Sequence, residues 1–321
     1  MYASGRGKLM QRGRLVVAVL THRRLEYLRL LLEKCALLRA PDSFDIEFLV
    51  VDNDPDASAR DVVSGASMPW RVEYMHEPRR GIPVARNKAL QEALKRQADL
   101  LCFIDDDEYP DPLWLTTLVS TWQNSGAHLV GGPVEIVPVA AEASPWQRFV
   151  NASLSARMKH KNKATAAAAA SGRRFTVVTN NWLGDLAYFA REGLVFDETL
   201  LLTGGEDTKF FAEARQRGAR VAWAADAMVY ESMPPQRLTL RYQMKRAAMQ
   251  SMQNFRFSWP RITAAAVAQT AFLVPLRLLS GTLLMIVPIY GIASPVVAVR
   301  AIGWAFGRIA ALFGRTSTLY G

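Results

Sequence analysis

Short apolar runs alternate with amphipathic segments over the first 125 residues or so. The β-branched and apolar runs predict buried strands over Leu15–Leu20, Ile46–Val51, Trp70–Met75 and Leu100–Ile104. Between them, apolar residues at helical spacing predict helices over Leu25–Leu38, Pro83–Ala98 and Trp114–Trp122. Strands that alternate with helices are typical of βαβ units, so we expect a mainly parallel sheet flanked by helices.

The pattern is weaker after Pro145. A basic segment followed by an alanine run predicts a mobile loop, helical in part, over Asn151–Arg174. Short strands are predicted over Thr176–Thr179, Ala187–Ala190 and Arg220–Ala224, and helices over Asp207–Arg217 and Gln236–Asn254. Gly218 suits the position just after the first of these two helices.

Two long apolar stretches, Ile262–Leu276 and Leu278–Val299, follow the basic helix. The second is long enough for a spanning helix, but Gly281, Pro288, Gly291 and Pro295 interrupt it. We therefore weigh a continuous spanning helix against a broken hairpin in one leaflet, with packing on the rest of the chain or a dimer interface as the third alternative. The predicted organisation is a basic tail over 1–14, a catalytic domain over 15–233 and a membrane-associating helical region over 234–321.

The net charge of +10 is unevenly distributed. Ten of the 39 Lys and Arg residues follow Glu231, and no Asp or Glu does, so the remaining 29 bases balance the 29 acids. The excess bases stand among apolar runs, which favours an anionic membrane surface over nucleic acid. The two cysteines, Cys35 and Cys102, form neither a metal pair nor a disulfide framework, and a reduced cytosolic setting fits.

Four consecutive carboxylates, Asp105 to Glu108, follow a predicted buried strand. Like charges at such a place repel one another, and a hard divalent cation such as Mn²⁺ or Mg²⁺ offsets the repulsion through oxygen ligands. In open α/β sheets, ligands bind beyond the carboxyl ends of the strands. We therefore expect a metal and a diphosphate at this turn, although an isolated acidic run is also compatible with a solvated loop.

Five motifs, in order, resemble family 2 glycosyltransferases with the GT-A fold, a Rossmann-like mixed sheet. They are the first strand with Thr21, Arg23 and Arg24, the VVDND segment Val50–Asp54, GIPVARN over Gly81–Asn87, the DXD-like Asp105–Asp107, and Gly204–Asp207. The resemblance covers roughly residues 14–235 and is nearest to transferases of bacterial exopolysaccharide assembly, including the succinoglycan type. Glu231 stands where many relatives carry a metal-binding His, so it either binds the cation or pairs with Arg237.

The resemblance implies a role for each motif. Asp207 would be the general base, with Glu206 close by. The donor would contact Thr21, Arg23, Asp52, Asp54, Arg86, Asn87, Asp105 and Asp106. The metal would be held by Asp105, Asp107 and Glu231. The acceptor would meet Asn180, Asn181 and Trp182, because amides and an indole face suit a sugar. Structural alternatives exist: Thr21 could cap a helix, and acids at the start of a helix are stabilising without any chemistry.

These features predict an inverting, metal-dependent transferase. It would move a sugar from a UDP-sugar to a lipid-linked saccharide at the cytoplasmic face of a bacterial inner membrane, in exopolysaccharide or cell-surface glycan synthesis. One plausible base and no evident nucleophile favour inversion. Processive polysaccharide synthases are the first alternative, but their Gln-x-x-Arg-Trp segment has no match near Gln236–Tyr242. A membrane scaffold with a dead transferase fold is the second, and it would have lost the acidic motifs that this chain keeps.

Overall fold

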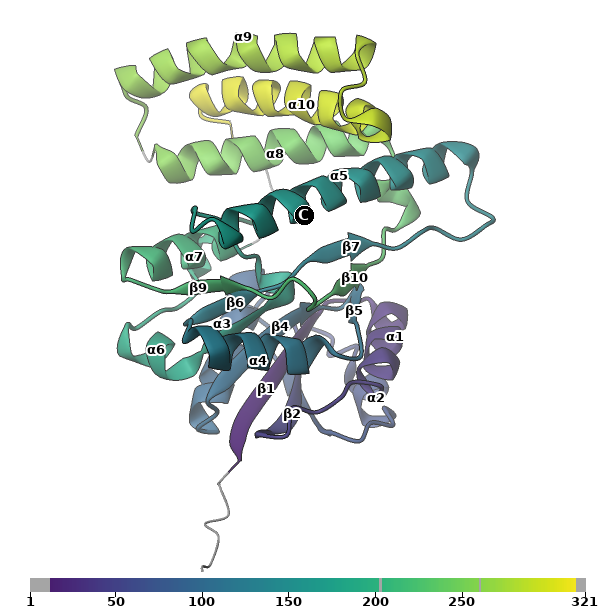
Figure 1. Cartoon of the computed structure of the whole chain (residues 1–321), viewed down its shortest axis with the longest axis vertical. Coiled ribbons are helices and arrows are strands. Elements are labelled where there is room, and N and C mark those ends of the chain that lie inside the picture. Colours follow the sequence, from purple (N-terminus) through teal and green to yellow (C-terminus); the bar gives the residue numbers. More distant parts are fainter. Residues whose placement is uncertain (1–11, 202–203, 260, 316–321) are drawn as a thin grey trace, which may run out of the picture.

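The computed structural model describes residues 12–201, 204–259 and 261–315 and consists of a sheet domain beneath a layer of helices (Figure 1). The central sheet has the strand order β3-β2-β1-β4-β8-β6-β9. Its strands are β1 Gly13–Thr21, β2 Phe44–Asp52, β3 Arg71–His76, β4 Leu100–Asp105, β6 Leu129–Gly131, β8 Trp182–Asp185 and β9 Val221–Trp223. Only β8 runs antiparallel to its two neighbours, so the predicted mixed, mainly parallel GT-A sheet is confirmed.

Helices cover both faces of this sheet because its central strands are apolar on both sides. One face packs on α1 Leu25–Cys35, α2 Arg60–Ser64 and α4 Trp114–Ser125. The other packs on α3 Ile82–Lys95, α6 Leu186–Arg191 and α7 Glu206–Gln216. Successive residues of β1 enter the two cores alternately: Val17 belongs to the first, and Val16 and Ala18 belong to the second. This double cover is what the near-continuous apolar runs of the sequence predict.

A small second sheet extends the carboxyl end of β4. It has the order β5-β10-β7, made of Glu108–Pro110, Val229–Glu231 and Val134–Ile136. Glu231 lies opposite Glu108 in the antiparallel pair of β10 with β5. Residues more than 100 positions apart in the chain are thereby brought beside the acidic turn.

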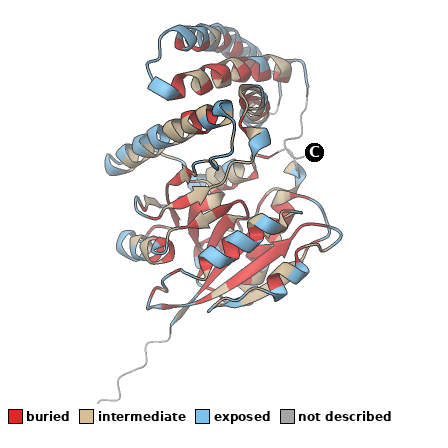
Figure 2. Cartoon of the chain, turned by 90° about the vertical axis from the view of Figure 1, so that its right-hand side faces the viewer, coloured by how far each residue is buried: buried red, intermediate tan, exposed pale blue. Residues whose placement is uncertain are grey.

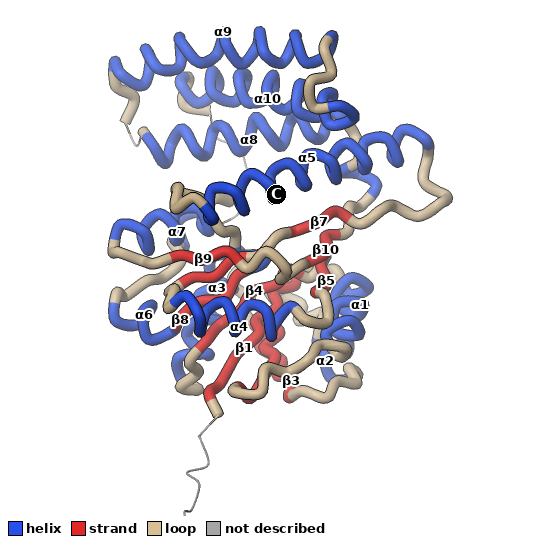
Figure 3. Tube along the Cα trace, viewed as in Figure 1, coloured by secondary structure: helices blue, strands red, loops and turns tan. Residues whose placement is uncertain are grey.

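The upper layer contains α5 Pro145–Ala170, α8 Leu240–Ser258, α9 Ala264–Ile286 and α10 Ser294–Leu312. Figure 3 shows these helices on one side of the strands, with α5 next to the small sheet and α9 farthest from it. Val150 and Leu154 of α5 form a core with Ile136, Leu238 and Val296. The layer is therefore packed onto the sheet domain through α5 and is not a detached tail.

Several segments differ from the prediction. The expected mobile loop over Asn151–Arg174 is mostly the 26-residue helix α5, which Ser144 begins with a capping box to Gln147. Thr176–Thr179 forms no strand and runs into a 3₁₀ turn over Thr179–Asn181. The expected strand Ala187–Ala190 is helix α6, capped by Asp185, whereas the true strand β8 lies just before it.

The two termini also refine the prediction. Most of the basic tail expected over 1–14 lies outside the described residues, and Gly13 and Arg14 already belong to β1. The continuous helix weighed for Leu278–Val299 is wrong, because α9 ends at Ile286 and α10 begins at Ser294 with Pro295 in its first turn. The Gly- and Pro-containing segment between them makes a hairpin. The domain boundary at Pro234 stays a prediction.

Two segments of the hairpin, Ala264–Ile286 and Gly291–Leu312, are long and apolar enough to cross a membrane by length and composition alone. Their surroundings differ. The helix α10 packs between α8 and α9, whereas most of α9 is exposed on its outer side (Figure 2). Large apolar side chains of α9 face solvent there, including Phe272, which is 68% exposed, and Leu279, which is 67% exposed.

The crossing of α8 and α10 depends on two glycines one helical turn apart. A Cβ atom at Gly303 would lie 2.2 Å from the carbonyl oxygen of Met244, and one at Gly307 would lie 2.0 Å from that of Ala248. Both neighbours are backbone atoms of a helix, which cannot move aside as a side chain can. The glycines therefore set how closely the two helices approach.

We expect Gly307→Ala to lower the free energy of unfolding by about 1–3 kcal/mol, the usual cost of overpacking. Helix propensity alone would raise stability by about 1 kcal/mol, so the sign of the change separates the two effects. Thermal unfolding in mild detergent measures it. Phe306→Ala on the exposed side of α10 is the control, because Phe306 is 57% exposed. A Gly307→Ala protein as stable as wild type or more so would contradict this crossing.

Candidate active site

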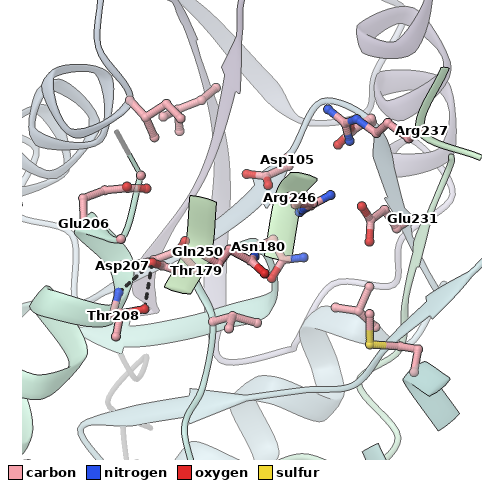
Figure 4. A pocket seen from close by; sticks show the side chains of 18 of the residues that line it. Asp105, Thr179, Asn180, Glu206, Asp207, Thr208, Glu231, Arg237, Arg246 and Gln250 are labelled. Carbon is pink, nitrogen blue, oxygen red and sulfur yellow. Dashed lines mark hydrogen bonds and ion pairs between the residues drawn. The ribbon is translucent and has the colours of Figure 1, made fainter. Parts of the chain in front are cut away.

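The carboxyl ends of β1, β2 and β4 meet at one edge of the sheet. The strand register places Thr21 beside Asp52 on one side, while Leu20 lies beside Asp105 on the other. A cavity of about 610 Å³ opens between this edge and the helical layer. Figure 4 shows carboxylates of the acidic turn, of α7 and of β10 around that cavity. The strand-end position expected for a ligand in an open α/β sheet is therefore hollow in this protein.

Arginines from outside the acidic turn neutralise part of its charge. Arg24 Nη1 donates to Asp106 Oδ1 at 2.9 Å and to Asp107 Oδ2 at 2.8 Å. Thr21 Oγ1 donates to the other oxygen of Asp106 at 2.9 Å, and Arg237 Nη1 approaches Asp107 Oδ2 at 3.3 Å. The alternative in which Arg237 pairs with Glu231 is not found, because Arg237 forms its ion pair with Asp107. Asp106 and Asp107 are thus held in place by cations of the chain itself.

Nearby arginines compensate only part of the cost of negative charge at this turn. Burial raises the pKa of Asp105; Arg86 opposes this rise and Asp107 reinforces it. Burial also raises the pKa of Glu231 to about 7, and the Asp107 charge adds to that effect. Asp106 shows the same direction, with its pKa raised to about 7 by burial. These shifts mean that negative charge is costly here, which is the condition that a bound cation relieves.

The donor set fits a hard divalent cation shared with substrate. Among the described residues, no three Asp, Glu, His or Cys side chains form a closed metal site by themselves. Mg²⁺, however, is usually held by one or two carboxylates together with substrate phosphates. In the described part of the chain, the carboxylates of Asp105 and Glu231 accept no hydrogen bond, and the charge of Asp107 acts on both. Oxygen ligands are therefore available beside the place for a diphosphate.

The first turn of α7 supplies two further acids with different surroundings. Glu206 is buried and pairs with Arg86, and Arg86 Nη2 lies 3.9 Å from Asp105 Oδ1. Asp207 is only half-buried, and its Oδ1 accepts from the backbone N–H of Thr208 at 2.6 Å and from its hydroxyl at 3.3 Å (Figure 4). Because Glu206 is held by Arg86, Asp207 is the carboxylate whose second oxygen is open to the cavity.

A glycine pair fixes how α7 enters the site. Gly204 and Gly205 have φ values of 79° and 85°, and Gly205 is the N-cap of the helix. This left-handed backbone conformation strongly favours glycine. It turns the chain so that the first helical residues, Glu206 and Asp207, point from the helix N-terminus toward the strand ends, where the helix dipole stabilises their charge.

The turn after β2 differs from the roles that the resemblance implies. Asp52 is fully buried and accepts from Ala59 N at 2.8 Å and Tyr74 Oη at 3.0 Å, so its oxygens support the turn. Asp54 is buried and pairs at 3.0 Å with Arg23, which lies outside the cavity lining. In this structure Asp52, Asp54 and Arg23 brace the turn and lie outside the cavity lining, and their contacts with a donor stay a prediction.

Asn53, between these two acids, is a cavity residue that the sequence analysis missed. Its amide donates to Glu77 O at 2.9 Å and Arg79 O at 2.8 Å, and its side-chain oxygen accepts from Gly81 N at 2.8 Å. The alternation of side chains along an extended chain was the available signal, because it sends Asn53 to the side opposite Asp52.

Three other residues with predicted ligand contacts have side chains that lie inside the protein. Asn87 exchanges hydrogen bonds with the backbone N and O of Phe196, both at 2.8 Å. Asn181 is fully buried and bonds to Trp114 Nε1 and to two backbone carbonyls. Trp182 packs among aromatic rings of the second core, including Phe103 at 5.6 Å between centroids. Only Asn180 of the predicted acceptor group lines the cavity.

The helical layer forms the opposite wall of the cavity. Arg157 and Lys161 of α5, Arg246 of α8 and Arg300 of α10 all line it. The sequence analysis placed the α5 residues in a mobile loop, helical in part, and missed Arg246 and Arg300. Their only sequence signal was the acid-free basic tail, which says nothing about where its side chains point.

Comparison with known proteins agrees with this architecture. The sequence model of Glycosyl transferase family 2 matches residues 16–182, and that of Glycosyl transferase family group 2 matches residues 100–313. The succinoglycan biosynthesis protein ExoM of Rhizobium meliloti (strain 1021) is 33% identical over 232 residues, which are 72% of this chain and 70% of that protein.

Solved structures show a more distant likeness. The crystal structure of S. aureus TarS 1-349 in complex with UDP-GlcNAc has a TM-score of 0.49 at 14% identity, covering 94% of this chain and 92% of that one. Its complex with UDP has the same TM-score at 15% identity, with the same coverage. At these values the likeness says nothing about the substrate of this chain. The match to the family over more than half of the sequence and the identity to ExoM show that the chain belongs to glycosyl transferase family 2.

Proposed function

We propose that this family 2 enzyme transfers a sugar from a UDP-sugar to a lipid-linked saccharide acceptor with inversion, in exopolysaccharide or cell-surface glycan synthesis. The observation that carries the proposal is the placement of Asp207 across one cavity from the acidic turn Asp105–Asp107. The name of the relative ExoM places that protein in succinoglycan biosynthesis, and we extend polysaccharide synthesis to this chain.

Asp207 supplies the base of a single displacement. Its open carboxylate oxygen takes the proton of an acceptor hydroxyl while the acceptor oxygen bonds to the anomeric carbon of the donor sugar. The bond from that carbon to the diphosphate breaks on the opposite face, which inverts the centre. Arg86 holds Glu206 away from this role and keeps a positive charge near Asp105, on the side of the leaving group.

The strand ends hold the donor in this proposal. Thr21, Asn53 and Arg86 line the cavity beside Asp105, so they surround the place for the nucleotide. A Mn²⁺ or Mg²⁺ ion held by Asp105, Asp107 and Glu231 would supply positive charge for the departing diphosphate. Arg24 and Arg237 position Asp106 and Asp107 for that purpose.

Attachment to the cytoplasmic face of the inner membrane is part of the proposal. The outer side of α9 exposes Phe272, Leu276, Leu279, Leu283 and Ile286, each by 47% or more. By contrast, α10 carries Arg300 and Arg308 toward other helices, where both donate to glutamine side chains. The charged residues of α10 have protein partners, whereas α9 has an exposed apolar face. This combination favours a hairpin that lies in one leaflet.

We expect Asp107→Asn to lower turnover by about 10²-fold, because the charge that the metal and the two arginines need is lost. Sugar transfer from a UDP-sugar panel to a membrane fraction is measured with Mn²⁺, with Mg²⁺ and with EDTA. Wild-type protein should lose activity in EDTA and regain it with either ion. Full wild-type activity in EDTA would contradict metal dependence.

We expect Asp207→Asn to lower turnover by about 10²-fold or more, the usual scale for loss of a general base, with unchanged affinity for UDP. Glu206→Gln is the companion variant, and because Glu206 pairs with Arg86, it should weaken UDP binding as well. Steady-state rates and calorimetric UDP titrations separate these effects. Near-normal turnover in Asp207→Asn would exclude this residue as the base.

We expect the protein to float with phosphatidylethanolamine and phosphatidylglycerol vesicles and to stay bound in high salt. Phe272→Glu with Leu279→Glu should reduce binding at least about tenfold, since each buried apolar side chain contributes about 1.5–3 kcal/mol. Leu37→Glu is the control, because Leu37 is 64% exposed on the sheet domain. Release by salt alone, or equal binding by all variants, would overturn the role of α9.

A further inference from the structure

Four cations from three helices face one region of the cavity. Arg157 and Lys161 are one turn apart on α5 and therefore share a helix face, while Arg246 comes from α8 and Arg300 from α10. These four residues are called the basic cluster below. They lie close enough to repel one another: Arg157 interacts electrostatically with Arg246, and Lys161 with both Arg157 and Arg300.

Three members of the basic cluster, Arg157, Lys161 and Arg300, form no ion pair with a carboxylate of the described residues. Arg300 donates to Gln243 Oε1 at 3.0 Å and to Gln250 Oε1 at 2.7 Å, and both acceptors are neutral amides. In the described parts of the chain, no carboxylate oxygen lies within 4.0 Å of the charged nitrogens of Arg157, Lys161 or Arg300. Arg24, Arg86 and Arg237, which lie around the acidic turn, differ because each is paired with a carboxylate.

Such an arrangement is unfavourable unless an anion binds there. Burial lowers the pKa of Arg157, and the nearby Arg246 lowers it further. Burial also lowers the pKa of Lys161; the charge of Arg157 adds to this lowering, while Asp207 and Glu231 oppose it. Like charges gathered at one wall of a cavity cost free energy, and phosphate oxygens, which accept charge-assisted hydrogen bonds from both Arg and Lys, offset that cost.

We propose that the basic cluster binds the pyrophosphate group of the acceptor, at a site separate from the one that holds the donor diphosphate. The inference rests on the proposed transferase function. It places the acceptor in the class of pyrophosphate-linked saccharides. It also assigns recognition of this acceptor to the cavity wall that the helical layer forms.

The position of the cluster favours the acceptor over the donor. The donor site lies at the strand ends with Thr21 and Asp105, whereas the cluster belongs to the helices on the opposite wall. The same helical layer exposes the apolar side of α9, so a lipid chain at that surface and its pyrophosphate would meet one structural unit. Lys161 also lies within electrostatic range of Asp207, so a saccharide bound at the cluster starts beside the base.

Binding of inorganic pyrophosphate to the full chain in detergent tests the site. Equilibrium dialysis is performed with Mg²⁺ and UDP in large excess, so that the donor site is filled. Wild-type protein should still bind pyrophosphate. Arg157→Gln with Lys161→Gln should bind it at least about tenfold more weakly, because two charged donors are lost. UDP affinity, measured separately, should be unchanged.

Lys163→Gln is the matched control. It removes one lysine from the same helix, but Lys163 lies outside the cavity lining whereas Lys161 belongs to it, so pyrophosphate binding should stay within about twofold of wild type. Lys161→Gln alone is the second variant, in case the double variant does not fold. A parallel measurement should show a raised KM for a lipid-pyrophosphate saccharide in both cluster variants and an unchanged KM for the UDP-sugar.

The outcomes separate the two proposals. Absence of UDP binding to the wild type would remove the proposed function itself. UDP binding without pyrophosphate binding would overturn the acceptor site alone. A loss of UDP affinity in Lys161→Gln, equal to its loss of pyrophosphate affinity, would assign the cluster to the donor and would also overturn the inference.

Discussion

The repulsion among carboxylates at the end of β4 is the constraint on which the rest of the site depends. A buried apolar strand delivers Asp105–Glu108 into a partly enclosed place, where unpaired negative charge is costly. Arginines from three distant elements form ion pairs with this turn: Arg24 precedes α1, Arg86 lies on α3 and Arg237 precedes α8. These ion pairs connect the sheet, a helix on each of its faces and the entry to the helical layer at one point. The site is consequently also a structural joint of the fold.

Local pattern was enough to predict the parts of the fold whose periodicity is complete within the segment. The strands β1, β2 and β4 and the helices α1, α3 and α4 each carry their own apolar run or stripe. The pattern failed for α5, since only its first half has an apolar face, with Val150 and Leu154, while its second half is stabilised by alanine propensity. It failed for β8 because Trp182–Asp185 is too short to alternate and is buried on both sides.

For the site, too, the sequence predicted some features and not others. The family resemblance implied that Thr21, Asp105, Arg86 and Asp207 contribute to one site, and all line the cavity. It could not predict side-chain direction. Asp52 and Asn53 are adjacent, and both side chains hydrogen-bond within the turn, yet only Asn53 also lines the cavity. The side chain of Asn181 forms three hydrogen bonds inside the protein. Nothing in the sequence distinguishes such a structural amide from an amide that would bind a sugar.

The positions of the C-terminal helices in the structure change the interpretation of this region. Its basic and apolar residues were expected to tether a catalytic domain that is complete without them. In the structure, α8 and α10 form a wall of the cavity, and the close crossing at Gly303 and Gly307 fixes that wall in position. The apolar side chains of α9 lie on the far side of the same layer. A helix that crossed the membrane alone could not keep Arg300 at Gln243 and Gln250. Because one packed layer presents cations inward and apolar residues outward, the proposed membrane attachment and the proposed acceptor site depend on the same group of helices.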